Sequence, residues 1–338
     1  MLVSGIFLSD ILDPSGSLSD DISPALDRVE DLLLETVGDC HEIVSHLLVS
    51  GGKRARPLLV LLTSCMGSGI NDAVIRAAAG IELIHLGSLY HDDVMDNAYI
   101  RHGSITAHRL WGKSAAILAG DFLFAKAGVL GLNLDKRAIA VQTEAFQRMI
   151  SGQLSETLGI SDSLDPLEAY IEVSRGKTGS LIAASAQVGA ILGDASPSTL
   201  EPLRDFGESI GVAFQLVDDV IDLSGKSGKT PGSDIRAGVM SLPILLLSNA
   251  AKDDRDSAVL LEEIERVRRH SGACGSDDYS SEMNAVLAHL RKHDVTARTL
   301  EIARTWGDKA KHALKKLPEC APRDALLAFV ETVVSREF

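Results

Sequence analysis

The stretch LYHDDVMDNAYIRHG, residues 89–103, places three aspartates beside a mostly apolar helical run and two basic residues just beyond it. Asp92 and Asp96 are four residues apart, so they share one helix face, and Asp93 is rotated by about 100° toward the flank. Carboxylates at this spacing repel by a few tenths of a kcal/mol per pair on an exposed helix, and by more where water is scarce. The stretch therefore predicts a positive partner that the sequence itself does not contain.

A second stretch, FQLVDDVIDL at residues 214–223, repeats this spacing with Asp218, Asp219 and Asp222. Both clusters end a segment that is apolar around most of its circumference, which is typical of a helix at the centre of a bundle. The partial negative charge of a helix C-terminus adds to the repulsion. Hard oxygen ligands in this number suit Mg²⁺ or Mn²⁺, and Mg²⁺ commonly joins carboxylates to substrate phosphates. Solvated helix ends are the alternative, and the repeated pattern favours the metal site.

The composition predicts a globular, almost wholly helical protein. Of 338 residues, 45% are hydrophobic and only 10 are proline. The apolar residues are largely Leu, Ile, Val and Ala, and they recur mostly with helical period, which indicates an all-α fold. A formal net charge of −14 argues against a nucleic-acid partner, because phosphate backbones are bound by Lys and Arg. A phosphate-bearing ligand would need local basic clusters or metal ions.

The sequence also indicates a cytoplasmic protein without an integral membrane segment. Its four cysteines lie far apart and form no C-x-x-C pair, so neither a zinc site nor a disulfide framework is expected. The N-terminal MLVSGIFLSD lacks the positive region of a signal peptide. The longest uncharged apolar-leaning run, TGSLIAASAQVGAILG from Thr178, falls short of the roughly 20 residues that a membrane span requires.

Glycine, proline and serine divide the chain into helical segments. Residues 1–22 are rich in Ser, Asp and Gly and are expected to form a loosely ordered tail, and residues 23–338 a single all-helical domain. Loops are expected at 224–238 and 268–281. Helices are expected at about 23–49, 56–66, 72–98, 113–131, 136–159, 166–193, 199–224 and 241–251, with more after 278.

A basic segment precedes the first acidic cluster. GGKRARP, residues 51–57, places Lys53, Arg54 and Arg56 behind a glycine pair at the head of an expected helix. It lacks the spacing of a P-loop. Free backbone and cations at a helix N-terminus nevertheless suit a diphosphate. A solvated basic turn is the alternative interpretation of this segment.

A second basic feature interrupts a helix. Gly176 and Gly179 flank Lys177 and Thr178 inside an otherwise helical run. This pattern predicts a helix break that exposes backbone carbonyls and the Thr178 hydroxyl to a cavity. The isolated cations that lie near glycine in the sequence are Arg101, Lys177 and Lys229.

Together these motifs resemble those of the trans-isoprenyl diphosphate synthases, also called polyprenyl synthetases. The match runs from GGKRARP to SLP at 241–243, covers most of the chain and keeps the family's order, so it is highly specific. The resemblance implies an all-α bundle of about ten or more helices around a deep central cavity. It also implies a homodimer that joins isopentenyl diphosphate to an allylic diphosphate with Mg²⁺.

The resemblance further implies roles for individual residues. Three Mg²⁺ ions, with Mn²⁺ as a substitute, would be held by Asp92, Asp93, Asp96, Asp218, Asp219 and Asp222. The allylic diphosphate would be bound by Arg101, Lys177, Gln215 and Lys229. The isopentenyl diphosphate would be bound by Lys53, Arg56, His85 and His102. The catalytic residues would be Lys177, Thr178 and Gln215.

Two positions depart from the family's pattern. Where many members have a second arginine after Arg101, this chain has His102, which would make contact with the isopentenyl diphosphate weaker or pH-dependent around neutrality. Val239 stands where many members carry a lysine, which removes one phosphate ligand. Neither departure changes an expected metal ligand.

The mechanism expected from the resemblance is ionisation, condensation and elimination. Mg²⁺ would neutralise charge on the departing diphosphate, and the isopentenyl double bond would attack the allylic cation that remains. Apolar helices would exclude water, while the Thr178 hydroxyl and the Gln215 side-chain oxygen would stabilise the cation. Proton loss to the released pyrophosphate would complete the cycle, so no protein base is required.

Product length is expected to depend on residues below the first cluster. Gly87 and Ser88 lie five and four residues before Asp92, roughly 6–7.5 Å along the helix at 1.5 Å per residue. A bulky aromatic residue there would close the cavity, whereas these small residues predict a long product, about octaprenyl to decaprenyl, as in quinone side chains. The alternative is that they only permit close helix packing, with Phe122 or Phe124 as a floor elsewhere.

Other functions remain as alternatives. One is a shorter-chain synthase that makes farnesyl or geranylgeranyl diphosphate. The His91–Asp92 pair, with His41 and His46 upstream, is also typical of helical metal-dependent phosphohydrolases, in which the second cluster would have no role. A terpene cyclase would share the first cluster and not the second. A non-catalytic partner subunit would lack carboxylates from one cluster, and both are intact here.

Overall fold

The computed structural model of the chain describes residues 11–12, 16–38, 40–159, 165–224, 230–271 and 280–335. Its first helices are α2 (Ser17–Val37), α3 (Glu42–Val49), α4 (Ala55–Ser64), α5 (Asp72–Met95), α6 (Ala107–Trp111), α7 (Lys113–Gly131) and α8 (Lys136–Leu158). They are followed by α9 (Pro166–Ser174), the π-helix η1 (Arg175–Gly179), α10 (Ser180–Leu192), the 3₁₀-helix η2 (Pro197–Thr199), α11 (Leu200–Ser224), α12 (Ser233–Ala237), α13 (Leu242–Ala250), α14 (Arg255–Ser271), α15 (Ser280–Lys292), α16 (Asp294–Leu314) and α17 (Ala321–Val334). Strands β1 (Ile100–Arg101) and β2 (Ser104–Ile105) form an antiparallel hairpin.

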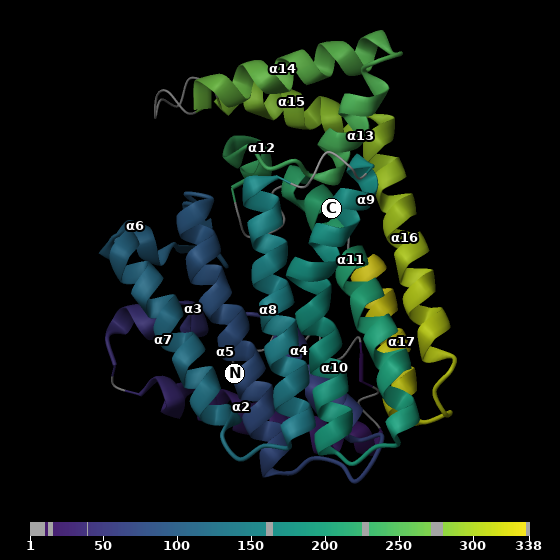
Figure 1. Cartoon of the computed structure of the whole chain (residues 1–338). Coiled ribbons are helices and arrows are strands. Elements are labelled where there is room, and N and C mark those ends of the chain that lie inside the picture. Colours follow the sequence, from purple (N-terminus) through teal and green to yellow (C-terminus); the bar gives the residue numbers. More distant parts are fainter. Residues whose placement is uncertain are drawn as a thin grey trace.

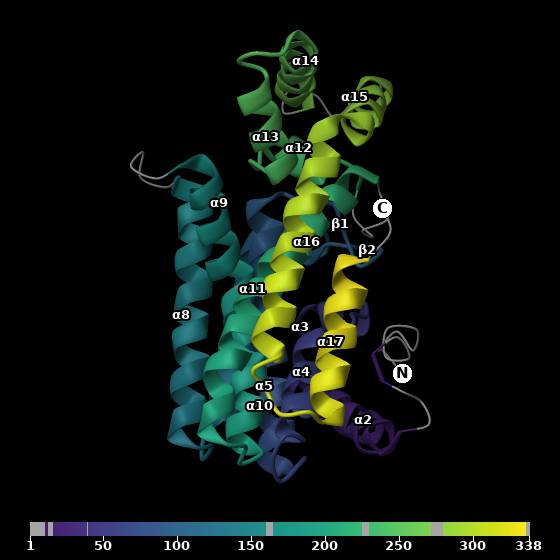
Figure 2. The ribbon, with the colours of Figure 1, turned by 90° about the vertical axis from the view of Figure 1, so that its right-hand side faces the viewer.

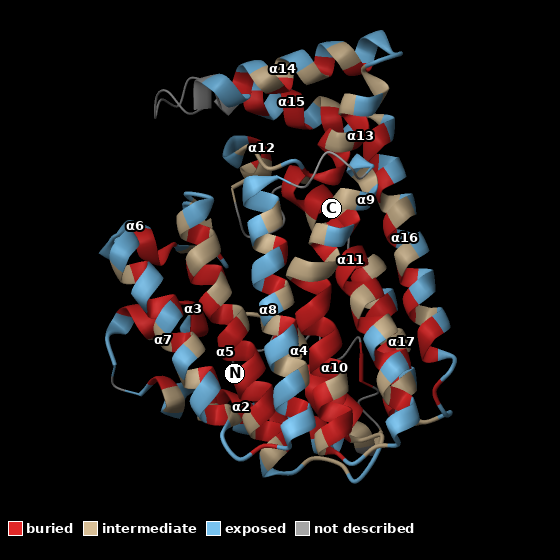
Figure 3. Ribbon diagram, in the orientation of Figure 1, coloured by how far each residue is buried: buried red, intermediate tan, exposed pale blue. Residues whose placement is uncertain are grey.

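The helices pack as a bundle with α10 and α11 at its centre. α10 packs along α4, α8 and α11, α11 also packs along α16, and α5 packs along α7. Figure 1 shows these helices side by side with α14 and α15 across one end, and Figure 2 shows α16 and α17 on one flank. Buried residues cover α10 and α11 on most sides, whereas α8 is largely exposed (Figure 3). The all-α fold expected from the helical periodicity is confirmed.

Two groups of buried apolar residues hold α11. Its first half, including Phe206 and Ile210, packs into a large core with α2, α4, α5 and α10. Its second half, including Leu216 and Ile221, packs into a separate core with α13, α14, α15 and α16. The acidic end of α11 is therefore fixed by a core of its own, which keeps its carboxylates at a defined place at one end of the bundle.

The α-helix expected at 166–193 is interrupted near the predicted position by a change of helix type, and the exposure of backbone carbonyls to a cavity stays a prediction. α9 ends at Ser174, residues 175–179 form the π-helix η1, and α10 begins at Ser180. Glycines on neighbouring helices make room for this wider turn. A Cβ atom on Gly152 of α8 would lie 2.5 Å from the backbone nitrogen of Lys177, and one on Gly211 of α11 would lie 2.3 Å from the Cα atom of Gly179. The π segment is thus in backbone contact with two helices.

Several expected boundaries are wrong. The helix expected at 23–49 is two helices, because Gly38 adopts a φ of 59° and ends α2. α2 begins at Ser17, within the expected tail of residues 1–22, because its apolar face, which includes the fully buried Ile22, packs on the core. The loop expected at 224–238 contains α12, and α14 extends into the expected connection at 268–281. Residues 1–10 and 13–15 of the expected tail lie outside the described residues.

Two of the described helices, α5 and α7, are long and apolar enough to cross a membrane by length and composition. In α5, 78% of the most apolar stretch is buried inside the bundle, as in the core helix of a globular protein. In α7 only 33% of that stretch is buried, and Leu118 and Val129 are exposed. The apolar surface of α7 therefore needs an explanation other than the core of this chain.

Candidate active site

The first acidic cluster lies where α5 ends. Asp96 is the C-cap of α5, and its backbone N–H donates to the carbonyl of Asp92 over 2.8 Å. Asp92 is partly exposed and Asp96 is exposed, whereas Asp93 is buried. An Oδ1 atom of Asp93 accepts from Arg101, whose Nε lies 2.8 Å and whose Nη2 lies 2.7 Å away. The two carboxylates that share a helix face are therefore accessible, and the third is held by a cation of the chain.

The β1–β2 hairpin positions Arg101. Asn97, His102 and Gly103 adopt φ values of 51°, 50° and 78°, which turn the chain back tightly after α5. Burial lowers the pKa of Arg101, but the carboxylates of Asp93, Asp92 and Asp96 raise it more, and the net shift is upward. The guanidinium therefore stays charged. It lies beside the first cluster, where Arg101 was expected from the sequence.

The second acidic cluster lies in the last turns of α11. Asp218 is partly exposed, whereas Asp219 and Asp222 are buried. Asp222 accepts a hydrogen bond of 2.5 Å from the Ser233 hydroxyl and one of 3.2 Å from the backbone N–H of Asp234. Asp222 thus joins the end of α11 to the start of α12, and Asp218 is the most accessible member of the cluster.

Three donors hold Asp219. They are the Tyr170 hydroxyl at 2.6 Å, the backbone N–H of Leu242 at 2.8 Å and Nε2 of Gln215 at 3.1 Å. Burial raises the pKa of Asp219 to about 6, and these hydrogen bonds oppose the rise. Burial also raises the pKa of Tyr170 well above its usual value, so the phenol remains a donor. Asp219 therefore fixes α9, α11 and α13 to one another, and its role as a metal ligand stays a prediction.

Lys177 on the π-helix η1 reaches toward the first cluster. Its Nζ donates to Oε2 of Glu156 on α8 over 2.6 Å. Burial lowers the pKa of Lys177, but Asp92, Glu156 and Asp96 raise it more, so the ammonium stays charged. Asp92 and Asp96 therefore act electrostatically on this ammonium, and its role as a ligand of the allylic diphosphate stays a prediction.

Thr178, the next residue of η1, reaches toward the second cluster. Its hydroxyl donates to Oε1 of Gln215 over 3.1 Å, and Gln215 lies one turn before Asp218 and Asp219 on α11. Adjacent residues of one π segment therefore contact the surroundings of both acidic clusters. Both clusters thus interact with η1, the first through its electrostatic effect on Lys177 and the second through Gln215, whose Nε2 donates to Asp219 over 3.1 Å.

The basic loop GGKRARP lies beside both clusters. Arg56 is near the start of α4, where burial lowers its pKa and the carboxylates of Glu82 and Asp218 raise it. His85 on α5 has a pKa well below its usual value because of burial and because of the positive charges of Arg56, His102 and Arg101. His85 is therefore neutral at pH 7, and it lies among the cations with which the resemblance groups it. Lys53, in the same loop, is exposed.

Arg54, between Lys53 and Arg56, is directed into the protein. It is only 2% exposed. Its Nη1 donates to Oε1 of Glu82 over 3.1 Å, and its Nη2 donates to the carbonyl of Leu48 over 2.9 Å. Arg54 is therefore engaged inside the protein, and it is not among the residues that the resemblance assigns to the isopentenyl diphosphate.

The structure differs from two further interpretations of the sequence, which concern the open position at Gly87 and the pairing of His91 with Asp92. A Cβ atom on Gly87 would lie 2.7 Å from Cε1 of Phe124, so the ring of Phe124 on α7 covers Gly87, as in the alternative of close helix packing. Ser88 is partly exposed and donates only to the carbonyl of His85, over 2.7 Å. The ring of His91 also faces α7, with Nε2 at 3.0 Å from the carbonyl of Ile117, which removes it from the phosphohydrolase pairing with Asp92.

The donor set fits a metal that is shared with a substrate. Among the described residues, no three of His, Cys, Asp or Glu lie close enough together to hold a metal ion by themselves. Asp92, Asp96 and Asp218 nevertheless offer hard, partly or fully exposed oxygens on two helices. Mg²⁺ keeps several waters and is commonly held by one or two carboxylates plus phosphate oxygens. These residues suit such an ion when a diphosphate lies between them.

The sequence patterns did not indicate two residues that contact the candidate site, and one expected residue lies outside the described part of the chain. Glu156 and Tyr170 contact Lys177 and Asp219 directly, yet Glu156 is an ordinary acid on an amphipathic helix and no spacing marks it. Tyr170 had a weak signal, because the chain has only four tyrosines. Lys229, expected at the allylic diphosphate, lies outside the described residues.

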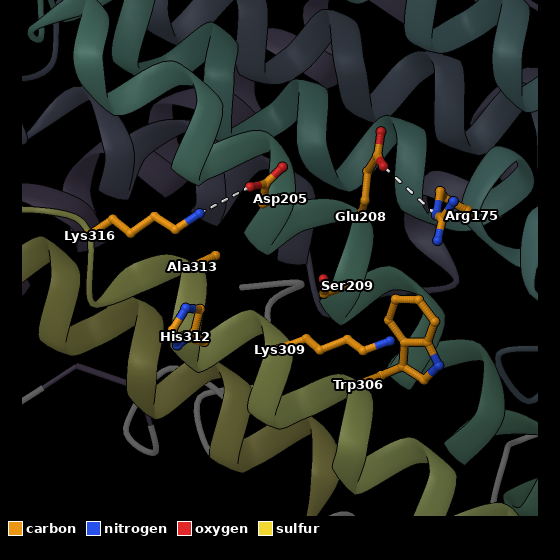
Figure 4. Close-up of a pocket in the computed structure, with 9 residues that line it drawn as sticks. All are labelled: Arg175, Asp205, Glu208, Ser209, Trp306, Lys309, His312, Ala313 and Lys316. Atoms are coloured by element: carbon orange, nitrogen blue, oxygen red, sulfur yellow. Dashed lines mark ion pairs between the residues drawn. The ribbon is translucent and has the colours of Figure 1, made fainter.

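A surface hollow of about 270 Å³ lies away from these groups, between α11 and α16 (Figure 4). Lys316 pairs with Asp205 at 3.5 Å, and Arg175 lies 3.8 Å from Glu208. Trp306 and Lys309 form another part of its wall. The hollow contains no carboxylate of either cluster, so it is separate from the candidate site.

The all-α bundle, with an acidic cluster near the end of each of two long helices, has the fold of the isoprenoid synthase class of proteins. Solved structures of this class share the fold. Polyprenyl synthase from Caulobacter crescentus CB15, solved with calcium and isoprenyl diphosphate, has a TM-score of 0.82 and 31% identity, and the match covers 96% of this chain and 99% of that one.

The polyprenyl synthetase family model matches residues 38–273. Nonaprenyl diphosphate synthase of Mycobacterium tuberculosis is 36% identical over 99% of this chain and 98% of that protein. Heptaprenyl diphosphate synthase component 2 of Geobacillus stearothermophilus is 32% identical over 95% and 97% of the two chains. The chain belongs to the polyprenyl synthetase family, and it is a transferase of prenyl groups.

Asp219 gives the protein a specific pH dependence of stability. Its pKa is about 6 when folded and near 3.8 when unfolded, so the folded state binds this proton more tightly. The contribution of Asp219 to the free energy of unfolding should therefore fall by about 2 kcal/mol as pH rises from about 4 to about 6. Urea unfolding of the wild type and Asp219→Asn in metal-free buffer should show this loss in the difference between them. A difference that does not change with pH contradicts the assignment.

Proposed function

We propose that the chain is a Mg²⁺-dependent trans-prenyltransferase of the cytoplasm that condenses isopentenyl diphosphate with an allylic diphosphate. Residues 23–338, together with the start of α2 at residues 17–22, would act as one catalytic domain. The observation that carries the proposal is the convergence of both acidic clusters on η1, through Lys177 and Thr178. Within the described residues Cys40, Cys65 and Cys320 are free thiols, in keeping with a reducing compartment.

The allylic diphosphate would lie between α5 and α11. Asp92, Asp96 and Asp218 would hold Mg²⁺ against it, because they are the accessible carboxylates of the two clusters. Lys177 and Arg101 would add positive charge on the side of α5. Three ions, Mn²⁺ in place of Mg²⁺, and a phosphate contact by Lys229 remain part of this proposal.

The isopentenyl diphosphate would lie beside the basic loop. Lys53 and Arg56 would bind its phosphates, and neutral His85 would add a hydrogen bond without adding charge. His102 lies near this group, since its Cε1 is 4.0 Å from the Cβ position of Gly52. The Caulobacter relative, solved with calcium and isoprenyl diphosphate, supports a site for a divalent ion and a diphosphate in this fold.

The reaction follows from these positions. Bound Mg²⁺ would neutralise the charge that builds on the departing diphosphate. The Thr178 hydroxyl donates its proton to Gln215, so the lone pairs of Thr178 remain available to the allylic cation. The isopentenyl double bond then attacks this cation, and the proton passes to the released pyrophosphate. The side chains hold charge and exclude water, and none of them has to accept a proton.

We propose that the active protein is a homodimer that pairs through α7 and α8. Leu118 and Val129 on α7 are eleven residues apart and share a helix face, and so do Ile139 and Ile150 on α8. All four side chains are exposed, on helices that lie on the same side of the bundle in Figure 3. A second copy that covers these faces would bury an apolar surface unusual for a monomer.

The homodimer is tested by sedimentation equilibrium. The wild type should sediment as a dimer at micromolar concentration, and Leu118→Glu, which places a charge on the proposed contact, should shift it toward monomer. Val259→Glu, an exposed apolar residue on α14, is the matched control and should leave the dimer unchanged. A wild type that sediments as a monomer contradicts the proposal.

The product should be long. The nonaprenyl and heptaprenyl relatives and the small, partly exposed Ser88 support a polyprenyl diphosphate of about octaprenyl to decaprenyl length. Purified protein incubated with farnesyl diphosphate, isopentenyl diphosphate and Mg²⁺ should give this product by chromatography, and EDTA should abolish it. A dominant geranylgeranyl product would support the shorter-chain alternative, and inactivity of the isolated chain with Mg²⁺ would support a partner subunit.

Ser88 offers a direct test of where the product grows. Ser88→Phe adds an aromatic ring one turn before Asp92 and should shorten the main product by at least one isoprene unit, because the ring occupies space below the reacting carbon. Chromatography of the products measures the change. Val259→Phe, at an exposed position on α14 away from the proposed dimer contact, is the control. An unchanged product length in Ser88→Phe rules out growth past this position.

A further inference from the structure

Arg54 lies at the centre of a buried group of charges. Its side chain is bonded to Glu82 on α5, and its Nε lies 3.9 Å from Oε1 of Glu30 on α2. Arg54, Glu82 and Glu30 are 2%, 3% and 7% exposed. We call these three residues the buried triad. It joins the loop before α4 to two helices that are far from it in the sequence.

The buried triad is poorly explained by stability alone. Removing charges from water costs more than their attraction returns unless the geometry is very good, and apolar residues of similar size often stabilise a protein equally well. A guanidinium shared by two carboxylates instead specifies direction, because its planar fork of donors fits only a few arrangements. The triad therefore fixes where the backbone of the loop lies.

The backbone of this loop needs such a support. Gly51 and Gly52 have φ values of 99° and 148°, and Arg54 has φ 50° and ψ 35°. The left-handed conformation is disfavoured for a residue with a Cβ atom, and it persists only where surrounding contacts impose it. Arg54 is also the N-cap of α4, and its carbonyl accepts the N–H of Leu58 over 3.0 Å. The direction in which α4 begins thus depends on Arg54.

The residues on either side of Arg54 are those proposed to bind isopentenyl diphosphate. With Arg54 directed inward, Lys53 is exposed, while the carboxylate of Asp218 raises the pKa of Arg56 and the charge of Arg56 lowers the pKa of His85. Glu82 contacts Arg54 and also acts on Arg56, so it links the buried side of the loop to the exposed side.

We propose that Arg54 is a positioning residue, which the buried triad holds in a left-handed conformation so that Lys53 and Arg56 present their charges to the diphosphate of isopentenyl diphosphate. This inference rests on the isopentenyl diphosphate site of the proposed function. Arg54 does not touch the substrate. It acts through the backbone on the two residues that do.

The first test is steady-state kinetics of Arg54→Lys. Lysine keeps the charge but cannot bond Glu82 and the Leu48 carbonyl together as the guanidinium fork does. The KM for isopentenyl diphosphate should rise about tenfold, since a displacement on the order of 1 Å is enough to weaken a positioned contact by this much. The KM for the allylic diphosphate and kcat at saturating isopentenyl diphosphate should stay within about twofold of the wild type.

A second variant tests whether the effect of changing Arg54 comes from the position of the loop or from a general loss of folding. Glu30→Gln/Arg54→Met/Glu82→Gln removes all three charges together, so no single charge is left buried. The same selective rise in the KM for isopentenyl diphosphate is expected. Val330→Ala, a core truncation on α17, supplies a protein of lowered melting temperature with the loop intact and should leave this KM unchanged.

Two further variants distinguish failure of the positioning role from failure of the proposed isopentenyl diphosphate site. Arg28→Met removes an exposed 2.7 Å ion pair with Asp72, which joins the same two helices as the buried triad, and should change neither KM. Arg56→Ala tests the site itself. A normal KM for isopentenyl diphosphate in Arg56→Ala overturns the proposed site, and this inference with it. A raised KM in Arg56→Ala together with an unchanged or non-selective response in both Arg54 variants overturns the positioning role alone.

Discussion

Mutual repulsion among carboxylates at the ends of α5 and α11 is the constraint around which the active end of the molecule is built. The chain relieves part of it internally, through contacts to the middle aspartate of each cluster and to Asp222. Asp93 is paired with Arg101, and Asp219 accepts three hydrogen bonds. Asp92, Asp96 and Asp218 remain accessible. The structure thus divides the clusters into acids that are buried and held by the fold, which are Asp93, Asp219 and Asp222, and accessible acids that are available to a cation and its diphosphate.

The positive groups, like the acidic clusters, combine buried supporting residues with accessible neighbours. Arg54 is engaged inside the protein, while Lys53 and Arg56 flank it. Lys177 is held by Glu156 from α8 and still lies close to the aspartates of α5. Binding groups of this kind need little reorganisation when a ligand arrives, because their supports are already in place.

The periodicity of apolar residues was enough to predict the all-α bundle, and the spacing of the aspartates was enough to predict two clusters at helix ends. The Gly176–Gly179 pair likewise predicted the break that became η1. Side-chain directions were not accessible in this way. Arg54 resembles Lys53 and Arg56 in the sequence, and only the positive φ of its backbone and the buried acids of α2 and α5 turn it inward. Gly87 was taken for an open position, and a ring from α7 covers it. Both depend on contacts between helices distant in the chain.

The π-helix η1 has a consequence for how this sequence can vary. A π turn holds one residue more than the α-helical turn that it replaces. Deleting any single residue between 175 and 179 would let the helix return to regular α geometry and rotate α9 by about 100° relative to α10. Tyr170 would then turn away from Asp219. Lys177 would lose its contact with Glu156, and Thr178 would lose its contact with Gln215. This segment should therefore accept replacement of its side chains far more readily than any change in its length.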